Sequence, residues 1–468
     1  MTIGAGNPAF AAILDAIRSA LDIDASAPVR ATGAGALPSL FPVSDLAAAS
    51  VAAAGLALAE LVEARFGRRP LPSSRGPSHG VTVDRRLAAF WFARSLHPQG
   101  WDLRPLWDPV AGDYRTADGW IRLHTNAPHH RDAALAVLGA PPEREAVAQA
   151  VARWRADDLE GAVVAAGGCA AAMRSAAAWA AHPQGEAVAR EPLIAWEAGG
   201  AGEAGLSGAQ GDRPLAGLRV LDLTRVLAGP VATRFLAGFG ATVLRLDPPG
   251  WEEPGVVPET TLGKACARLD LKDPAGRARF EDLLATADVL VHGYRADALA
   301  SLGLDTVARA RLRPGLIDVG LDAYGWTGPW RARRGFDSLV QMSSGLAEAG
   351  MACAGADRPV PLPVQALDHA TGYLMAAACL RGLTRRLATG RGCVARLSLA
   401  RTAALLAAAP APRPEEQPAA PERADFAEAP EPTGWGPALR LHPPVALDGV
   451  PMRWDRPAGP LGAAAPAW

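Results

Sequence analysis

The sequence predicts an α/β fold in which helices cover both faces of a parallel β-sheet. From Leu218 onward, short runs of apolar and β-branched residues alternate with longer helical stretches that begin or end at Gly, Pro or Asp. Strands and helices that alternate at this spacing are typical of a parallel sheet covered on both faces. The length of 468 residues leaves room for two or three domains with large cores.

Each expected element follows from its local chemistry. The stretch "GPVATRFLAGFG" predicts a helix that begins after Gly229-Pro230, because proline suits the first helical turn, and that ends at Gly240. Asp273, followed by Pro274, predicts the N-cap of the next helix. The expected strands are 218–224, 241–247, 288–294 and 316–322, and the expected helices are 229–240, 273–287 and 296–312.

Ligands of such sheets bind at the carboxyl ends of the strands. These ends carry the segments "TRVLAGP", "DPPG", "HGYRAD" and "DAYGWTGP". The first turn lacks the GxGxxG pattern that brings the backbone close to a pyrophosphate. The sequence therefore argues against a nicotinamide or flavin dehydrogenase.

The composition excludes several classes of partner. With a net charge of −1 and 20% charged residues, nothing indicates binding to nucleic acid or to an anionic membrane. The five cysteines are scattered without metal-ligand spacing, so we expect reduced thiols and no metal. No signal peptide is predicted, and Glu60 interrupts the Ala-rich run after Leu46, which we interpret as a buried helix. A cytoplasmic location is therefore expected.

Between Pro214 and about Leu406 the sequence resembles the class III CoA-transferases, the CaiB/BaiF family. The resemblance implies a Rossmann-like CoA-binding large domain and a smaller α+β domain. It also implies acyl-CoA and a carboxylic acid as substrates, with no permanently bound cofactor. Four segments carry it, in the family's order: "PLAGLRVLDLTRVLAGPVATRFLAGFGATVLRLDPPG", "GKACARLDLKDPAGRARFEDLLATADVLVHGYRADALASLGLD", "DAYGWTGPWRARRGFDSLVQMSSGLAEAG" and "LPVQALDHATGYLMAAACLRGLTRRLATGRGCVARLSLARTAALL".

By this resemblance Asp368 is the catalytic nucleophile. Moving CoA between two carboxylates needs a group that can itself become a thioester, and a carboxylate can do so through a mixed anhydride. Asp368 precedes the predicted helix "HATGYLMAAACLRGLTRRL", whose free N–H groups are expected to favour the ionised form. The glycine at 372 would allow a close approach. The alternative is an ordinary N-cap, a position that Asp favours.

The resemblance also implies which residues contact CoA. The first turn would hold the nucleotide, and a lysine would lie near the phosphates. Two residues that replace an Asn-Phe pair of the family would flank CoA, and an aromatic ring would line its thiol end. The alternatives are solvated charges for the basic residues and a core position for Tyr294. In that order the residues are Arg225, Val226, Leu227 and Ala228; Lys264; Gly293 and Tyr294; and Tyr324.

The first half of the chain looks like a second copy of the Asp368 segment. "FPVSDLAAASVAAAGLALAELVEARFGRRP" and the following "GVTVDRRLAAFWF" repeat its order of Pro-Val, Asp, Ala-rich helix, strand and helix, which places Asp45 where Asp368 stands. Asp45 lacks the glycine four residues on, so we interpret it as a degenerate copy or a structural N-cap. The stretch "DPVAGDYRTADGWIRLHTNAPHH" resembles the opening of the family's small domain.

These patterns predict a rearranged or partly duplicated chain. In order, the expected parts are a helical leader (1–27), a partial repeat of the large-domain Asp segment (28–100), a small-domain-like region (101–198), a flexible linker (199–213), the CoA-binding large domain (214–408), a Pro/Ala-rich linker, extended or disordered (409–437), and a C-terminal tail that packs on the large domain (438–468).

Two other functions stay open at this point. Racemases of the family carry a catalytic His in a "GHD" motif, and the matching triplet here is Gly335-Phe336-Asp337, in which Phe336 cannot exchange a proton. The other alternative is a catalytically inactive paralogue that binds acyl-CoA or serves in assembly. The acyl group, its donor and the oligomeric state are open, and a homodimer is one arrangement that the resemblance allows.

Overall fold

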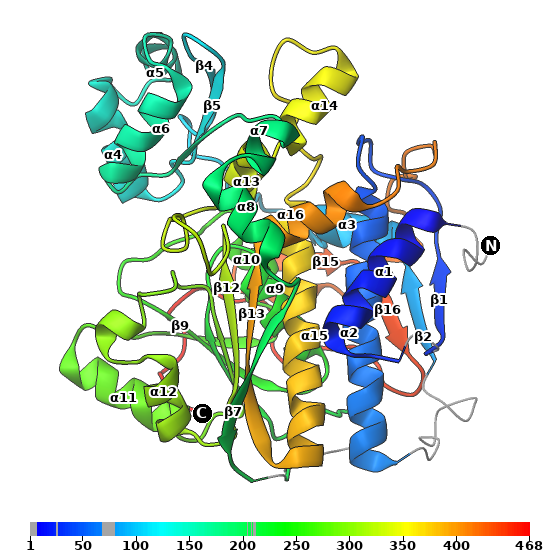
Figure 1. Cartoon of the computed structure of the whole chain (residues 1–468). Coiled ribbons are helices and arrows are strands. Elements are labelled where there is room, and N and C mark those ends of the chain that lie inside the picture. Colours follow the sequence, from blue (N-terminus) through cyan, green and yellow to red (C-terminus); the bar gives the residue numbers. More distant parts are fainter. Residues whose placement is uncertain (1–6, 25–26, 68–79, 204, 207, 209–211) are drawn as a thin grey trace.

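A seven-stranded sheet forms the centre of the structure, a computed structural model that describes residues 7–24, 27–67, 80–203, 205–206, 208 and 212–468 (Figure 1). Its strand order is β10-β9-β8-β11-β12-β13-β7, and every neighbouring pair is parallel except β13 with β7. The predicted α/β fold is therefore confirmed. The strands are β7 (Ala195–Ala201), β8 (Arg219–Leu223), β9 (Thr242–Asp247), β10 (Lys264–Arg268), β11 (Val289–His292), β12 (Ile317–Asp322) and β13 (Arg391–Ser398).

Both faces of this sheet are buried, because successive side chains of a strand point to opposite faces. In β8, Val220 packs in the core on the face covered by α9 and α15, whereas Leu221 and Leu223 pack in the core beneath α11. The helices on the first face are α1 (Pro8–Leu21), α2 (Val43–Phe66), α9 (Ala228–Gly238) and α15 (Ala366–Thr389), and those on the second are α11 (Pro274–Leu284) and α12 (Thr306–Leu312).

Helices α2 and α15 pack side by side along the first face (Figure 1). Helix α2 is long and apolar enough to cross a membrane by length and composition, with a mean hydropathy of 1.7 in its most apolar window. In the fold, 94% of that window is buried against other parts of the chain. The burial explains its composition, since a helix that is apolar all round suits a core position.

A smaller α+β unit lies apart from the large sheet, at the upper left of Figure 1. Its three-stranded antiparallel sheet, in the order β4-β5-β6, packs on three helices around a core that contains Tyr114, Ile121 and Val163. The elements are β4 (Gly112–Arg115), β5 (Trp120–Leu123), α4 (Pro128–Leu138), α5 (Arg144–Val151), α6 (Ala156–Ala165) and β6 (Ala170–Ala172), followed by α7 (Ala176–Ala180) and α8 (Pro183–Arg190).

Two further three-stranded sheets join the C-terminal residues to the first half of the chain, in the orders β1-β2-β16 and β14-β15-β3. Beyond them, Trp454 donates a hydrogen bond from its indole to the carbonyl of Arg234 in α9. The strands are β1 (Val29–Thr32), β2 (Val81–Asp84), β3 (Leu96–Pro98), β14 (Glu431–Thr433), β15 (Gly436–Arg440) and β16 (Val445–Leu447), and the remaining helices are α3 (Arg85–Ala93), α10 (Val257–Thr260), α13 (Asp337–Ser343), α14 (Leu346–Ala354) and α16 (Leu399–Ala408).

Several predicted boundaries differ from the structure. The helix expected over 296–312 is a short 3-10 turn followed by α12, because Gly303 adopts a φ of +74° between them. The expected linker 199–213 begins inside β7, which pairs with β13, and its residues 204, 207 and 209–211 lie outside the described residues, as do parts of the leader 1–27. The expected linker 409–437 contains β14 and the start of β15, so its last residues belong to a sheet.

Gly372 brings α15 unusually close to α9. A Cβ at this position would lie 2.4 Å from the carbonyl oxygen of Ala228 and 2.9 Å from the Cβ of Val231. Carbon atoms do not approach an oxygen so closely, so only glycine allows the observed contact between the two helices. The first turn of α15, which carries Asp368, is thereby held next to the turn that begins α9.

We therefore expect Gly372→Ala to lower the free energy of unfolding by about 1–3 kcal/mol, as overpacking does in tight cores. The matched control is Gly161→Ala, because Gly161 is an exposed glycine inside α6 with no atom within 4 Å of its Cβ position. There alanine should stabilise by about 0.5–1 kcal/mol. Thermal melts of both variants measure the difference, and equal melting temperatures would contradict the packing argument.

Candidate active site

The strand order places a crevice at the carboxyl ends of β8 and β11. Strands β9 and β10 lie on one side of β8 in the sheet, and the later strands β11 and β12 lie on its other side. Such a reversal is where open α/β sheets bind ligands. Arg225 follows β8 and Tyr294 follows β11, and the two meet there, with the guanidinium donating to the phenol oxygen at 3.2 Å.

Arg225 is fixed between two aromatic rings. Its guanidinium carbon lies 4.5 Å from the ring centre of Trp251 and 5.3 Å from that of Tyr294. Cation–π contacts on both sides order a side chain that is otherwise flexible. The structure thus brings together Arg225 and Tyr294 from the predicted set and adds Trp251, which the sequence did not single out.

The turn after Arg225 has a strained backbone. Val226 has a φ of +65°, in the left-handed region that β-branched residues rarely adopt. Its N–H donates to the Glu253 carboxylate at 2.7 Å, which holds the turn in this conformation. Leu227 then caps α9 and Ala228 is its first residue, two positions before the start expected from Pro230. Strain of this kind clusters at ligand sites.

Lys264 lies below this turn rather than at its surface. Its ammonium is buried, 3.0 Å from the Asp222 carboxylate and 2.9 Å from the carbonyl oxygen of Pro230. Asp222 also accepts hydrogen bonds from Thr224 and Thr233, so it joins the end of β8 to α9. Lys264 therefore supports the turn from inside, and its position offers no direct contact to a phosphate at the sheet edge.

Gly293 and Tyr324 occupy different surroundings. No atom lies within 4 Å of a Cβ built at Gly293, so the chain beside Tyr294 is open there. Tyr324 is fully buried, and its hydroxyl lies 3.1 Å from that of Ser343. A ring in this position supports the loop that carries Gly335, whose Cβ position would lie 2.7 Å from it. It does not line an open cavity.

Asp368 is the third residue of α15 and lies beside a second carboxylate. Its backbone N–H donates to Asp337 at 2.9 Å. Burial, and then the charge of Asp337, raise the pKa of Asp368 well above its usual value, and burial raises the pKa of Asp337 to about 6. The expectation that the helix terminus favours the ionised form is therefore wrong. Desolvation and like charge outweigh the helix dipole.

His369 is neutral and packed. Burial and the nearby Arg234 lower its pKa to about 3, and its ring stacks on Phe92 of α3 at 5.0 Å. Phe92, from the first half of the chain, therefore packs against the helix that carries Asp368. Among the described residues, Nδ1 of His369 has no hydrogen-bond partner.

A cavity of about 340 Å³ opens between the small unit and the strained turn. Val226 and Trp251 line it from the large sheet, and Trp107 and His124 line it from the small unit. Phe336, which directly precedes Asp337 in the sequence, also lines it. Perturbed carboxylates next to a partly apolar cavity are typical of catalytic sites. Over the part of the chain that the structure describes, no cluster of His, Cys, Asp or Glu could hold a metal ion.

A family model described as "CoA-transferase family III" matches residues 215–460. The match covers more than half of the chain and includes the crevice, the turn and Asp368.

The chain belongs to CoA-transferase family III.

Relatives within this family are similar over the same part. The succinyl-CoA:glutarate CoA-transferase of Mus musculus is 36% identical over 195 residues, covering 38% of this chain and 44% of the relative. The succinate–glutarate CoA-transferase of Agrobacterium fabrum is 34% identical over 200 residues, covering 38% and 49%. A crystal structure of Rv3272 from Mycobacterium tuberculosis is 30% identical, with a TM-score of 0.37 and coverage of 41% and 56%. The chain spans about half the length of the curated relatives it matches.

Asp45, outside the part matched by family III, has a different environment from Asp368. It is also the third residue of a 24-residue helix, α2. However, Arg85 binds its carboxylate with two nitrogens, at 2.7 and 3.3 Å, and Asn7 donates a further hydrogen bond at 2.8 Å. Asp45 is therefore part of a buried ion pair rather than the simple N-cap that the sequence suggested.

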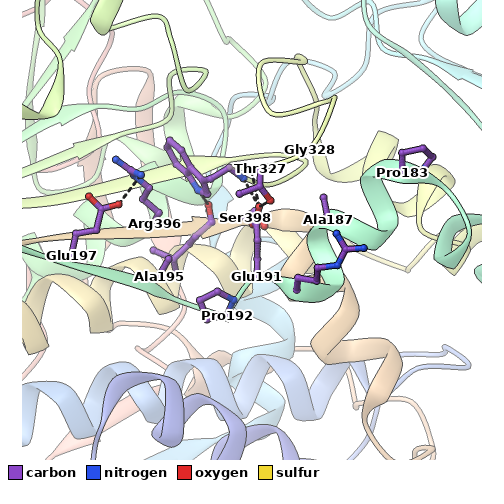
Figure 2. A pocket seen from close by; sticks show the side chains of 13 residues that line it. Pro183, Ala187, Glu191, Pro192, Ala195, Glu197, Thr327, Gly328, Arg396 and Ser398 are labelled. Carbon is purple, nitrogen blue, oxygen red and sulfur yellow. Dashed lines mark hydrogen bonds and ion pairs between the residues drawn. The ribbon is translucent and has the colours of Figure 1, made fainter.

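A second cavity, of about 610 Å³, is lined by none of the predicted site residues (Figure 2). Its charged side chains are already paired. Glu191 accepts hydrogen bonds from the backbone of Trp326 and Thr327 and from the Thr327 hydroxyl, and Arg396 lies 2.8 Å from Glu197. Neither Asp368 nor Asp337 lines this cavity, so we place the candidate active site at the first cavity.

The two aspartates should respond oppositely to loss of charge. Asp368→Asn should raise the melting temperature at pH 7.5, since a raised folded pKa means that ionisation costs stability above pH 4, and the gain should shrink toward pH 4. Asp45→Asn should lower the free energy of unfolding by about 1–2 kcal/mol, because two Arg85 hydrogen bonds to the carboxylate are weakened. The loss is limited because Arg85 keeps Glu415 as a partner at 2.8 Å and because burial raises the pKa of Asp45 as well. Thermal melts at both pH values test this, and a destabilised Asp368→Asn would contradict it.

Proposed function

We propose that the protein is a CoA-transferase that moves CoA from an acyl-CoA thioester to a free carboxylic acid, with Asp368 as the nucleophile. The observation that carries the proposal is the environment of Asp368. Among the described residues, no donor other than solvent satisfies its side-chain carboxylate, and its pKa is raised by burial and by Asp337. A basic, unpaired carboxylate attacks a carbonyl better than one neutralised by a cation.

The chemistry proceeds in four steps. A carboxylate oxygen of Asp368 attacks the thioester carbonyl, and the C–S bond breaks. CoA leaves as a thiolate, and a mixed anhydride between Asp368 and the acyl group remains. The thiolate attacks the aspartyl carbonyl and releases the first carboxylate, which leaves an aspartyl-CoA thioester. The acceptor carboxylate attacks this thioester and expels the thiolate again. The thiolate finally attacks the acceptor's carbonyl, which yields the new acyl-CoA and free Asp368.

The surrounding residues would bind rather than react. The turn from Arg225 to Ala228, with Gly293 and Tyr294 across the crevice, is suited to hold the nucleotide, because Arg225, ordered by the rings of Trp251 and Tyr294, offers positive charge there. Lys264 would act through Asp222 by fixing this turn. Tyr324 would support the loop that leads to Asp337.

We also infer that residues 28–100 are an inactive copy of the Asp368 segment. In both places a 24-residue helix packs against two paired parallel strands and precedes the second of them in the sequence, and a short helix follows that strand: α2 with β1, β2 and α3, and α15 with β12, β13 and α16. In both, a third strand pairs antiparallel to the second, β16 with β2 and β7 with β13. The pairing of Asp45 with Arg85 removes the free carboxylate that the reaction needs.

Covalent trapping distinguishes the two aspartates. After incubation with an acyl-CoA, hydroxylamine should form a hydroxamate at Asp368 and not at Asp45, and peptide mass spectrometry locates it. Asp368→Asn should remove both the label and CoA transfer while the protein stays folded. A label on Asp45 would reverse the assignment. Absence of any label, together with unchanged transfer in both variants, would falsify the anhydride mechanism.

The pH profile tests the role of Asp337. Because the nucleophile must be ionised, CoA transfer should rise with pH as Asp368 loses its proton, well above the usual range, since burial and the charge of Asp337 raise the pKa of Asp368. Asp337→Asn removes the neighbouring charge and should move this rise to lower pH. Its amide oxygen can still accept the Asp368 N–H. An unchanged or upward-shifted profile would show that Asp337 does not control Asp368.

A further inference from the structure

We propose that the acyl group transferred at this site is uncharged and apolar beyond its reacting carbonyl, with an aromatic ring favoured, and that the cavity beside Phe336 holds it. The inference rests on the proposed function and names its substrate class. It concerns only the pocket side chains, which the reaction itself does not use.

The cavity adjoins the reacting centre on two sides. Phe336 is followed directly by Asp337, whose carboxylate binds the backbone N–H of Asp368. Val226 lies in the turn that begins α9, against which Gly372 packs the Asp368 helix. On this proposal, an acyl chain that extends from a carbonyl at Asp368 lies in this cavity.

Aromatic rings line the cavity. His124 stacks on Phe336 with ring centres 3.7 Å apart, and Trp107 meets His124 edge to face at 5.8 Å. Trp251 faces them from the large sheet. Burial lowers the pKa of His124 to about 3, so its ring is neutral and behaves as a further aromatic surface. Walls of this kind favour an aromatic guest through stacked and edge-to-face contacts.

Two polar side chains of the lining, Asp108 and Asn126, already have partners. Asp108 accepts from Thr125 at 2.8 Å and pairs with Arg131 at 3.3 Å. Asn126 is bonded to the backbone of Asp108 and Leu106.

Glu253, the deepest acid in the lining, is held in the same way. It accepts from the N–H of Val226 and from the indole of Trp251, both at 2.7 Å, and it pairs with Arg245 at 2.8 Å. A second carboxylate on the acyl chain would therefore meet two acids, Asp108 and Glu253, whose own charges are already paired, which makes its desolvation costly. The basic residue of the lining, Arg104, is exposed at the mouth.

The size of the cavity fits a ring. Its volume of about 340 Å³ exceeds the roughly 150 Å³ of an apolar protein cavity that holds benzene. A phenylacetyl-sized group is therefore accommodated with room for the carbonyl. The names of the mouse and Agrobacterium relatives refer to succinate and glutarate, which carry two carboxylates, so the inferred substrate class departs from them.

The test is an identity exchange, which needs no knowledge of the natural second acid. Full-length protein is incubated with phenylacetyl-CoA and deuterated phenylacetate, or with succinyl-CoA and ¹³C-succinate, and label entering the thioester is followed by mass spectrometry. We expect kcat/KM for phenylacetyl exchange to exceed that for succinyl exchange at least about tenfold, the ratio that 1.4 kcal/mol of differential binding gives. Equal or faster succinyl exchange would overturn the inference.

Two tryptophans of equal exposure supply a matched pair of variants. Trp107, at 37% exposure, lines the cavity, whereas Trp435, at 36%, lies outside it and stacks on Trp101. Trp107→Ala should reduce phenylacetyl exchange about five- to tenfold, mainly through KM, as loss of an aromatic contact does. Trp435→Ala should leave phenylacetyl exchange unchanged. Equal effects of the two variants would overturn the inference.

A gain of function completes the test. Leu106 is exposed at the cavity mouth, and Leu106→Arg adds a cation there. This variant should narrow the preference for phenylacetyl over succinyl at least about threefold, a modest effect because a surface ion pair is weak. An unchanged ratio would argue against the cavity as the acyl site.

If no thioester exchanges and hydroxylamine labels nothing, the proposed function fails. Succinyl exchange with a label on Asp368 overturns only the substrate class.

Discussion

The contact between the first turns of α9 and α15 determines the geometry of the candidate site. Gly372 has no side chain, so α15 lies against the carbonyl of Ala228, and Asp368, one helical turn earlier, lies beside the turn that begins α9. The same turn starts at the crevice between β8 and β11, where Arg225 meets Tyr294. One missing methyl group thus aligns the expected nucleophile with the expected nucleotide crevice. The strained backbone at Val226 is stabilised by the hydrogen bond from its N–H to Glu253 and by the buried Asp222–Lys264 pair beneath the turn.

Buried charges in this protein differ by whether they have a partner. Lys264 and Asp222, and likewise Arg85 and Asp45, neutralise one another inside the fold. Asp368 and Asp337 do the opposite, since two acids share a buried site and repel each other. Paired charges are a structural device, whereas an unpaired acid is destabilising and persists only where it serves another purpose. This contrast separates the two aspartates that occupy equivalent positions in α2 and α15.

The sequence predicted the fold well where hydrophobic patterning is decisive, and less well where long-range contacts decide. The strands around Leu221 and Leu290 are apolar throughout, as two-sided burial requires, and they were found within one or two residues. Asp337 escaped notice as a partner of Asp368 because 31 residues separate them in the sequence. Lys264 looked like a phosphate ligand, since no pattern reveals that Asp222 lies opposite it in the folded sheet. The raised pKa of Asp368 likewise depends on burial that only the packed structure provides.

The edge of the large sheet shows that a boundary in sequence similarity is not a boundary in folding. The family match begins at residue 215, yet β7, from the first half, completes the sheet by pairing with β13. Helix α2, also from the first half, covers the apolar side of α15. A chain that began at Pro214 would leave an open strand edge and a bare hydrophobic helix face, the two features that most promote aggregation. The two halves therefore share one sheet and one hydrophobic core, so the stability of the Asp368 site also depends on residues that never meet a substrate.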